Sequence, residues 1–157
     1  DKGGENIKPL TGANSAMLTS NSPSLSVAGE FVGYNKMVFN GQTLLTIPAQ
    51  AGSFAMPATD LTDIGSVTLN MAIQGEVTNP ITFEIRLDSP NGPVVGQGAV
   101  NPGPGMQVPQ VPLPMFIADI QLTGGEDGQQ HKLYFVSDPK GADLGTAIII
   151  GMTFNAK

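Results

Sequence analysis

Residues 82–100, with the sequence TFEIRLDSPNGPVVGQGAV, constrain the fold more than any other part of the chain. Phe83, Ile85 and Leu87 alternate with polar residues, and this period of two places apolar side chains on one face of a β-strand. Ser89–Gly92 then supplies turn chemistry, because proline pre-sets φ and Asn-Gly tolerates positive φ. The chain resumes with two valines. The stretch therefore predicts two strands joined by a tight turn.

Further short apolar runs at fairly regular intervals predict the other strands. Within residues 65–73, apolar side chains alternate with Thr68, Asn70 and Ala72, as in a half-buried strand. The run Ile148–Ile150 is apolar on both faces and predicts a central, covered strand. No window combines helical periodicity with caps, so we expect no long helix. The predicted strands are Ala16–Thr19, Leu25–Val27, Lys36–Phe39, Leu44–Ile47, Ser53–Met56, Gly65–Ile73, Ile81–Asp88, Val94–Val100, Phe116–Leu122, Lys132–Ser137 and Ala147–Phe154.

The abundance of turn-forming residues agrees with this pattern. The 157 residues include 13 prolines and 20 glycines, and they stand between the apolar runs rather than in one tract. A chain of this length forms one domain with a sizeable core. We expect a flexible segment over residues 1–5 and a single all-β module, an antiparallel β-sandwich, over residues 6–157. Residues 101–114 hold many prolines and predict a long loop, where binding sites commonly lie.

Charge and composition exclude several classes of function. The net charge is −6 and Arg86 is the only arginine, which argues against a nucleic-acid partner. No apolar run is long enough to span a membrane as a helix. The absence of cysteine excludes disulfides and thiolate metal sites. Low charge with abundant Thr, Asn, Gln and Gly is typical of a secreted or periplasmic bacterial β-module.

The sequence gives little support to catalysis. The single histidine, His131, opens a predicted strand after a polar turn, and no carboxylate stands beside it at strand spacing. A solvated or capping role is therefore the better interpretation than a general base. Motifs of nucleophilic, metal-dependent and nucleotide-binding enzymes are absent. We expect no enzymatic activity from this chain, with hydrolysis as the minor alternative.

Sugar binding by a β-sandwich requires an aromatic face for the C–H surface of the sugar, together with amides for its hydroxyl groups. The chain has no tryptophan, and Tyr134 lies between apolar residues on a predicted strand. Tyr34 is the better platform candidate, with Phe31 as an alternative. The candidate ligand-binding residues are Tyr34, Asn35, Gln97, Asn101, Met106 and Gln107.

A structural calcium ion is a side hypothesis. Calcium takes six to eight oxygen ligands from carboxylates and carbonyls. Asp60 and Asp63 supply two nearby carboxylates, and Glu126 with Asp127 supplies another pair. Neither pair matches an EF-hand loop.

Several spaced segments resemble family-6 carbohydrate-binding modules. They are FEIRLDSPNGPVVGQGAV at residues 83–100, GQQHKLYFVSDPKG at 128–141, IIIGMTF at 148–154 and the preceding FAMPATDLTDIGSVTLNMAIQG at 54–75. The similarity covers roughly residues 38–154. The FEIRL segment also resembles the version appended to bacterial sugar dehydrogenases with pyrroloquinoline quinone and cytochrome c units, and to ThuA-type proteins.

The resemblance implies a galactose-binding-like jelly roll, often with a structural calcium ion, in a periplasmic or extracellular protein. Sugar-binding members place an aromatic residue in the loop that corresponds here to residues 101–114, where this chain has none. The last aromatic of the family's second segment is replaced by Val136-Ser137. Asp88 and Gly92 match the family motif and are interpreted as turn residues.

Two functions follow as expectations. The first is a non-catalytic accessory module of a larger secreted enzyme that binds carbohydrate and targets the enzyme to a glycan. The second is a structural module that docks on another domain of the same polypeptide and binds no sugar, which the missing aromatic residues favour.

Overall fold

The computed structural model describes residues 25–74, 77, 79–103, 105–107, 113–139 and 146–157. Over these residues it contains one short 3-10 helix, η1 (Leu25–Val27), followed by ten strands. The strands are β2 (Gly29–Val32), β3 (Asn35–Phe39), β4 (Gln42–Thr46), β5 (Gly52–Thr59), β6 (Ile64–Ile73), β7 (Ile81–Leu87), β8 (Val94–Val100), β9 (Met115–Leu122), β10 (His131–Asp138) and β11 (Ala147–Ala156).

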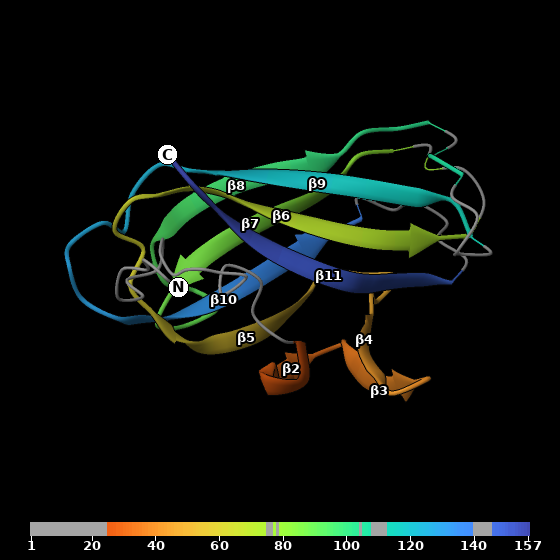
Figure 1. The fold of residues 1–157 in the computed structure, drawn as a ribbon, viewed down its shortest axis with the longest axis horizontal. Helices are drawn as coiled ribbons and strands as arrows, with labels where there is room; N and C mark the ends of the chain where they lie inside the picture. Colours follow the sequence, from red (N-terminus) through yellow and green to blue (C-terminus); the bar gives the residue numbers. More distant parts are fainter. Residues whose placement is uncertain (1–24, 75–76, 78, 104, 108–112, 140–145) are drawn as a thin grey trace, which may run out of the picture.

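The strands pair in the order β2-β5-β10-β7-β8-β9-β6-β11-β4-β3, and every pair of named strands is antiparallel. In the ribbon, β9, β6 and β11 lie over β8, β7 and β10, which gives two packed layers (Figure 1). The prediction of an all-β antiparallel sandwich is confirmed. No helix among the described residues has the length and apolarity needed to cross a membrane.

The core lies between the two layers and follows from the alternating pattern. In β6, Val67, Leu69 and Met71 are fully buried, and in β7 the inward residues Phe83 and Ile85 are buried to the same degree. The outward residues between them remain half-buried. Complete burial of each such side chain contributes about 1.5–3 kcal/mol, so this face of the pattern supplies much of the driving force for folding.

The layers join along one side, where β8 passes close to β9. Their ladder consists of Gly96↔Leu122 and Gln97↔Gln121. A Cβ at Gly98 would lie 2.3 Å from the backbone oxygen of Asp119, so this approach requires glycine. The Gly-Gln-Gly of β8 thus allows one strand to turn the corner between the sheets.

Three of the strand predictions need comment. Leu25–Val27 forms a 3-10 turn instead of a strand, and strand β2 (Gly29–Val32) was not predicted. Ile148–Ile150 lies in β11, which is central because it pairs with both β6 and β4, but Ile148 and Ile150 are only half-buried. The segments 1–5 and 16–19 lie outside the described residues.

Candidate functional site

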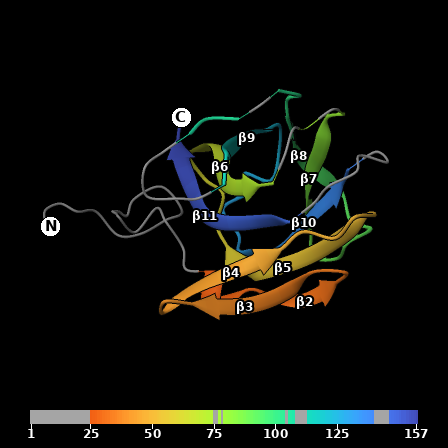
Figure 2. The same ribbon diagram turned by 90° about the vertical axis from the view of Figure 1, so that its right-hand side faces the viewer.

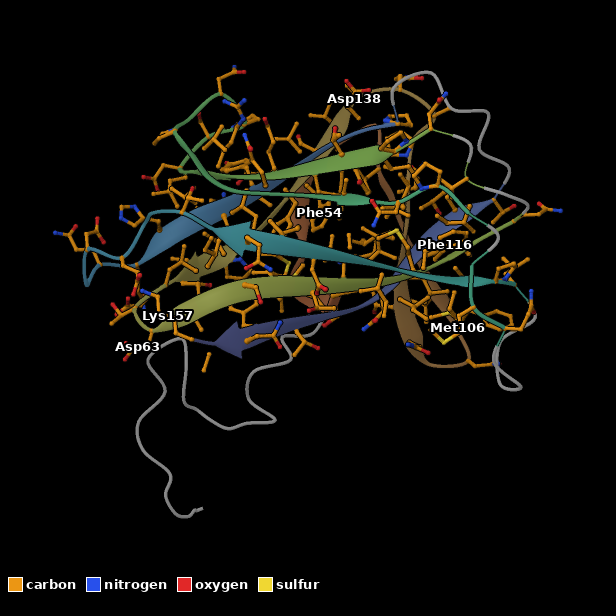
Figure 3. All side chains as sticks on the ribbon, turned by 90° about the horizontal axis from the view of Figure 1, so that it is seen from above. Phe54, Asp63, Met106, Phe116, Asp138 and Lys157 are labelled. Carbon is orange, nitrogen blue, oxygen red and sulfur yellow. The ribbon has the colours of Figure 1, made fainter. Side chains whose placement is uncertain are left out.

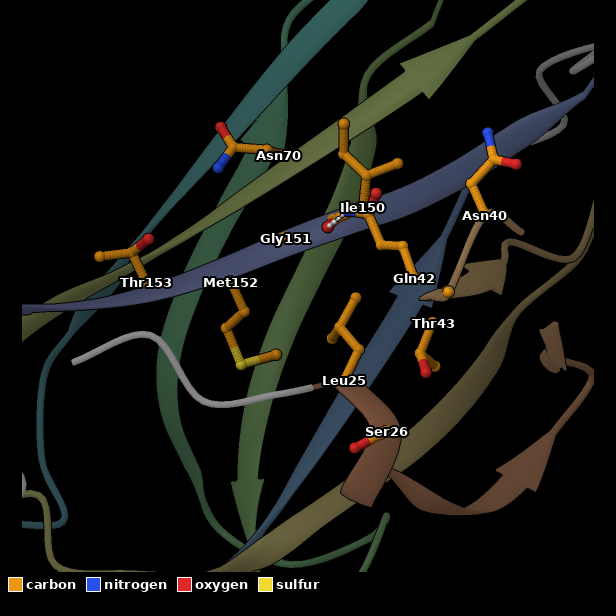
Figure 4. A pocket seen from close by; sticks show the side chains of 11 residues that line it. Leu25, Ser26, Asn40, Gln42, Thr43, Asn70, Ile150, Gly151, Met152 and Thr153 are labelled. Atoms are coloured by element: carbon orange, nitrogen blue, oxygen red, sulfur yellow. Dashed lines mark hydrogen bonds between the residues drawn. The ribbon is translucent and has the colours of Figure 1, made fainter. Parts of the chain in front are cut away.

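The larger of two described surface hollows lies on the outer side of β6 and β11, beside the β3–β4 hairpin. Its volume is about 540 Å³, within the usual range for small-ligand sites. Figure 4 shows the side chains that line it, which come from these strands and from η1. The lining residues are Leu25, Ser26, Asn40, Gly41, Gln42, Thr43, Asn70, Ile150, Gly151, Met152 and Thr153.

The β3–β4 hairpin forms one wall of this hollow. β3 and β4 pair without a register shift from Asn35↔Thr46 to Phe39↔Gln42. Asn40 and Gly41, with φ of 52° and 77°, form the two-residue turn between them, as an Asn-Gly sequence favours. Gln42 Nε2 also donates a hydrogen bond of 3.3 Å to the Ile150 carbonyl, which ties the turn to β11.

Asn70 is the side chain best placed to recognise a ligand in this hollow. It is half-buried on β6, and its amide forms no hydrogen bond or other polar contact within the described part of the chain. An amide offers two donors and one acceptor, and leaving them unpaired in a partly buried place is costly. Gly151 lies beside it, where a Cβ would meet the Asn70 Nδ2 at 3.5 Å. The arrangement leaves Asn70 open to a polar ligand.

The rest of the lining is neutral. Amide and hydroxyl groups of Asn40, Thr43 and Thr153 stand around buried apolar groups of Leu25 and Met152. None of the lining side chains is ionisable. The hollow can therefore hydrogen-bond hydroxyl groups and contact C–H groups, but it has no means of holding a strong charge.

A second hollow of about 430 Å³ lies on the other sheet and includes Gln97, one of the predicted binding residues. Gln97 is exposed on β8 opposite Glu84 of β7. Arg86 donates to Glu84 Oε1 from Nε at 3.0 Å and from Nη2 at 2.8 Å, so the carboxylate is largely compensated. In this hollow a ligand would therefore meet the amide of Gln97 beside the ion pair of Glu84 and Arg86.

Tyr34 does not face solvent, so the prediction that it forms an exposed sugar platform is wrong. Its side chain is 3% exposed. The ring packs edge-on against Phe54, with centroids 4.9 Å apart, and its hydroxyl donates a 2.6 Å hydrogen bond to buried Ser137 Oγ. Burial raises the pKa of Tyr34 well above its ordinary value of 10, with the Ser137 hydrogen bond opposing this. Phe31, the alternative, is partly buried and packs against the core.

The remaining predicted binding residues are exposed but do not form one site. Asn101, Met106 and Gln107 belong to the segment between β8 and β9, where the backbone of Met106 pairs with Met115. Figure 3 places Met106 near one end of the molecule, with Asp63 and Lys157 near the other. Asn35 begins β3, at the far end of the strand order from β8. Binding at the 101–107 segment stays a prediction.

Calcium binding at Asp60 and Asp63 stays a prediction, and the nearby carboxylates of Asp60 and Glu126 already have hydrogen-bond partners. Asp60 Oδ1 accepts hydrogen bonds from the Thr62 backbone N–H at 2.9 Å and its hydroxyl at 2.6 Å, as in an Asx turn. Glu126 pairs with Lys157 and accepts from the Asp63 N–H, so its carboxylate is also engaged. No group of three or more histidine and carboxylate side chains able to hold a metal ion occurs among the described residues.

Sequence reasoning missed the surroundings of His131. Its Nδ1 lies 3.0 Å from Asp88 Oδ2 and its Nε2 lies 2.8 Å from Asp127 Oδ2. These contacts with Asp127 and Asp88 raise the pKa of His131, and the contact with His131 lowers that of Asp127. Since both ring nitrogens are engaged, the imidazole joins the turn that holds Asp88 to the turn that holds Asp127.

Comparison with solved structures relates this fold to carbohydrate-binding modules. A family 6 carbohydrate-binding module from Clostridium cellulolyticum, solved with xylose, matches with a TM-score of 0.62 and 18% identity over 85% of this chain and 95% of that one. CsCBM6-3 from Clostridium stercorarium, solved with cellobiose, matches with a TM-score of 0.58 and 18% identity, over 87% and 93% of the two chains.

A larger enzyme contains the same fold as one part of its chain. It is a family 43 arabinoxylan arabinofuranohydrolase from Bacillus subtilis, with a TM-score of 0.54 and 19% identity, covering 77% of this chain and 23% of the enzyme. No protein-family model matches the chain, and no curated protein matches it. At these identities the likeness establishes the jelly-roll sandwich fold.

Proposed function

We propose that this chain is a non-catalytic accessory module that binds a neutral carbohydrate in the hollow around Asn70. The observation that carries the proposal is the half-buried, unpaired amide of Asn70 in an uncharged hollow lined by further amides and hydroxyls. The fold shared with carbohydrate-binding modules supports it. A net charge of −6 favours a neutral glycan over an acidic one.

The module acts by raising the local concentration of an attached enzyme on its glycan. Because the described hollow lacks an aromatic platform, we expect weak binding, with a dissociation constant of ~1 mM, equivalent to about −4 kcal/mol. We place the module in a larger secreted bacterial protein, periplasmic or extracellular. The FEIRL segment supports a parent of the quinoprotein sugar dehydrogenase or ThuA type.

Affinity electrophoresis through gels containing neutral polysaccharides, such as xylan, β-glucan and mannan, tests the proposal. Asn70→Ala should weaken retention roughly two- to tenfold, the effect of losing hydrogen bonds of about 0.5–1.5 kcal/mol. Gly151→Val should weaken it further by filling the space beside Asn70. Gln97→Ala is the matched control, because it removes an exposed amide from the opposite face.

Each alternative has its own outcome. Loss of retention in Gln97→Ala but not in Asn70→Ala moves the site to the second hollow. Loss only in Met106→Ala moves it to the segment between β8 and β9. If wild-type protein migrates unretarded through every polysaccharide, the carbohydrate proposal is wrong.

A second candidate function is an interaction module that binds no sugar. The observation that favours it is the exposed apolar surface of β3, where Val38 is 69% and Phe39 is 61% exposed. Such surfaces are commonly used for protein contacts.

A further inference from the structure

The outer face of the sheet continues past Asn70, and the strand registers show which side chains share it. In antiparallel strands, residues that pair directly lie on the same face. Asn70 of β6 pairs with Gly151 of β11 on one side and with Ile117 of β9 on the other. Figure 2 shows β9, β6, β11 and the β3–β4 hairpin side by side in this order. Asn70 therefore lies between the hollow, on its β11 side, and the outward face of β9.

Ile117 is the apolar part of the outward face of β9. It lies within the strand, and its side chain is 47% exposed. Its neighbours Phe116 and Ala118 are buried, because side chains alternate between the two faces of a strand. The branched aliphatic group of Ile117 thus lies beside the open amide of Asn70, where it can contact the C–H groups of a sugar.

Asp119, two residues further along β9, is the polar part of this face. It is exposed and points the same way as Ile117. The Thr68 hydroxyl donates a 2.8 Å hydrogen bond to Asp119 Oδ1 and accepts one of 2.8 Å from Asn155 Nδ2. These bonds orient the carboxylate, and its Oδ2 has no partner within the described part of the chain. A carboxylate oxygen held in this way is a preorganised acceptor for a hydroxyl group.

We propose that the ligand is an extended internal stretch of a linear neutral polysaccharide that crosses the strands from the β3–β4 hairpin to β9, an inference that rests on the proposed function. One sugar unit occupies the hollow, a following unit lies on Ile117 and Asp119, and Asn70 stands between them. Among the described residues the lining of the hollow ends at Asn70 on the β9 side. From β4 to β9 is three strand spacings of ~4.8 Å, about 14 Å, which is longer than a single sugar unit. The charge of Asp119 favours a neutral chain over an acidic one.

NMR titration of the full chain with disaccharides and tetrasaccharides of the cello, xylo and manno series tests the proposal. The wild type should bind the tetrasaccharide of the recognised series roughly tenfold more tightly than the disaccharide, the effect of a further hydrogen bond to a charged group. Asp119→Ala and Ile117→Ser should each reduce this ratio of affinities, whereas Asn70→Ala should weaken the binding of both lengths. Thr68→Val removes the hydroxyl that orients Asp119 and should reduce the ratio by less than Asp119→Ala. Gln121→Ala, at the next outward position of β9, is the matched control and should leave both affinities unchanged.

The outcomes separate this inference from the proposed function. Equal affinity of the wild type for the two lengths, with both weakened by Asn70→Ala, overturns the extended ligand and leaves the sugar site in place. A loss of tetrasaccharide binding in Gln121→Ala as large as in Asp119→Ala also overturns it, because the ligand would then run along β9 instead of across the strands. A wild type that binds neither length in any series shows that the sugar site itself is wrong. Circular dichroism checks the fold of each variant, and Asp119→Asn, which keeps an acceptor for the threonine hydroxyl, tests the contact if Asp119→Ala does not fold.

Discussion

The buried pair of Tyr34 and Ser137 gives the sharpest prediction about stability. Tyr34→Phe keeps the ring against Phe54 and removes only the hydroxyl that donates to Ser137 Oγ. Ser137 is fully buried, so no water molecule can take the place of the tyrosine hydroxyl as its hydrogen-bond partner. Such a loss costs about 1–3 kcal/mol. For a chain of this size the melting temperature should fall by roughly 3–10 °C.

Urea unfolding followed by circular dichroism measures this change, with Tyr134→Phe as the matched variant. Tyr134 donates to the carboxylate of Glu30 at a partly buried place, so water can replace the lost partner and the cost should be smaller. Adding Ser137→Ala to Tyr34→Phe should cost less than the sum of the two single changes, because the first change already breaks the shared bond. A cost for Tyr34→Phe no greater than that for Tyr134→Phe, or strict additivity with Ser137→Ala, would refute the reasoning.

The same residue predicts an alkaline dependence of stability. Burial holds the pKa of Tyr34 above its unfolded value of about 10. Above that pH the unfolded chain releases the phenol proton while the native state retains it. The contribution to stability is complete below about pH 10 and declines as the pH rises towards the folded pKa. Unfolding in Tyr34→Phe should have a shallower pH dependence in this range.

Two further predictions concern His131, which starts β10, and Gly98, which lies where β8 passes close to β9. The pKa of His131 is raised by Asp127 and Asp88, so the contribution of the charged histidine to stability is complete below about pH 6.5 and is lost as the pH rises through the folded pKa. The free energies of unfolding of the wild type and His131→Gln in urea should therefore converge above the folded pKa. A difference that stays constant with pH would contradict this. Gly98→Ala should prevent stable folding, because its methyl group would meet the Asp119 backbone, and a circular dichroism melt matching the wild type would contradict this.

Local pattern was sufficient for the core strands. The alternation in residues 65–73 and 81–88 matches the burial of β6 and β7 almost residue by residue, because each strand has one face on the core and side-chain direction alternates strictly. The Asn-Gly of residues 40–41 forms its tight turn for an equally local reason. Sequence predicts such features because neighbours in the chain determine them.

The site was less accessible to prediction. The hollow around Asn70 is assembled from η1, the β3–β4 hairpin, β6 and β11, so no spacing in the sequence identifies it; the outward position of Asn70 on an alternating strand is the only signal. Tyr34 follows a glycine in a composition typical of loops, and tertiary contacts with Phe54 and Ser137 bury it instead. Both the assembly of the hollow and the burial of Tyr34 are determined by contacts between residues that lie far apart in the sequence.

The two outermost strands, β2 and β3, follow one another in the chain, with only Gly33 and Tyr34 between them. They are the two edge strands of the sheet, and each forms one edge, here called a rim, on the side of the sandwich away from the contact between β8 and β9. This dipeptide fixes the spacing of both rims, since Tyr34 is anchored in the interior and Gly33 has a φ of 79°. A substitution there displaces both rims together, whereas one within β2 or β3 acts on a single rim.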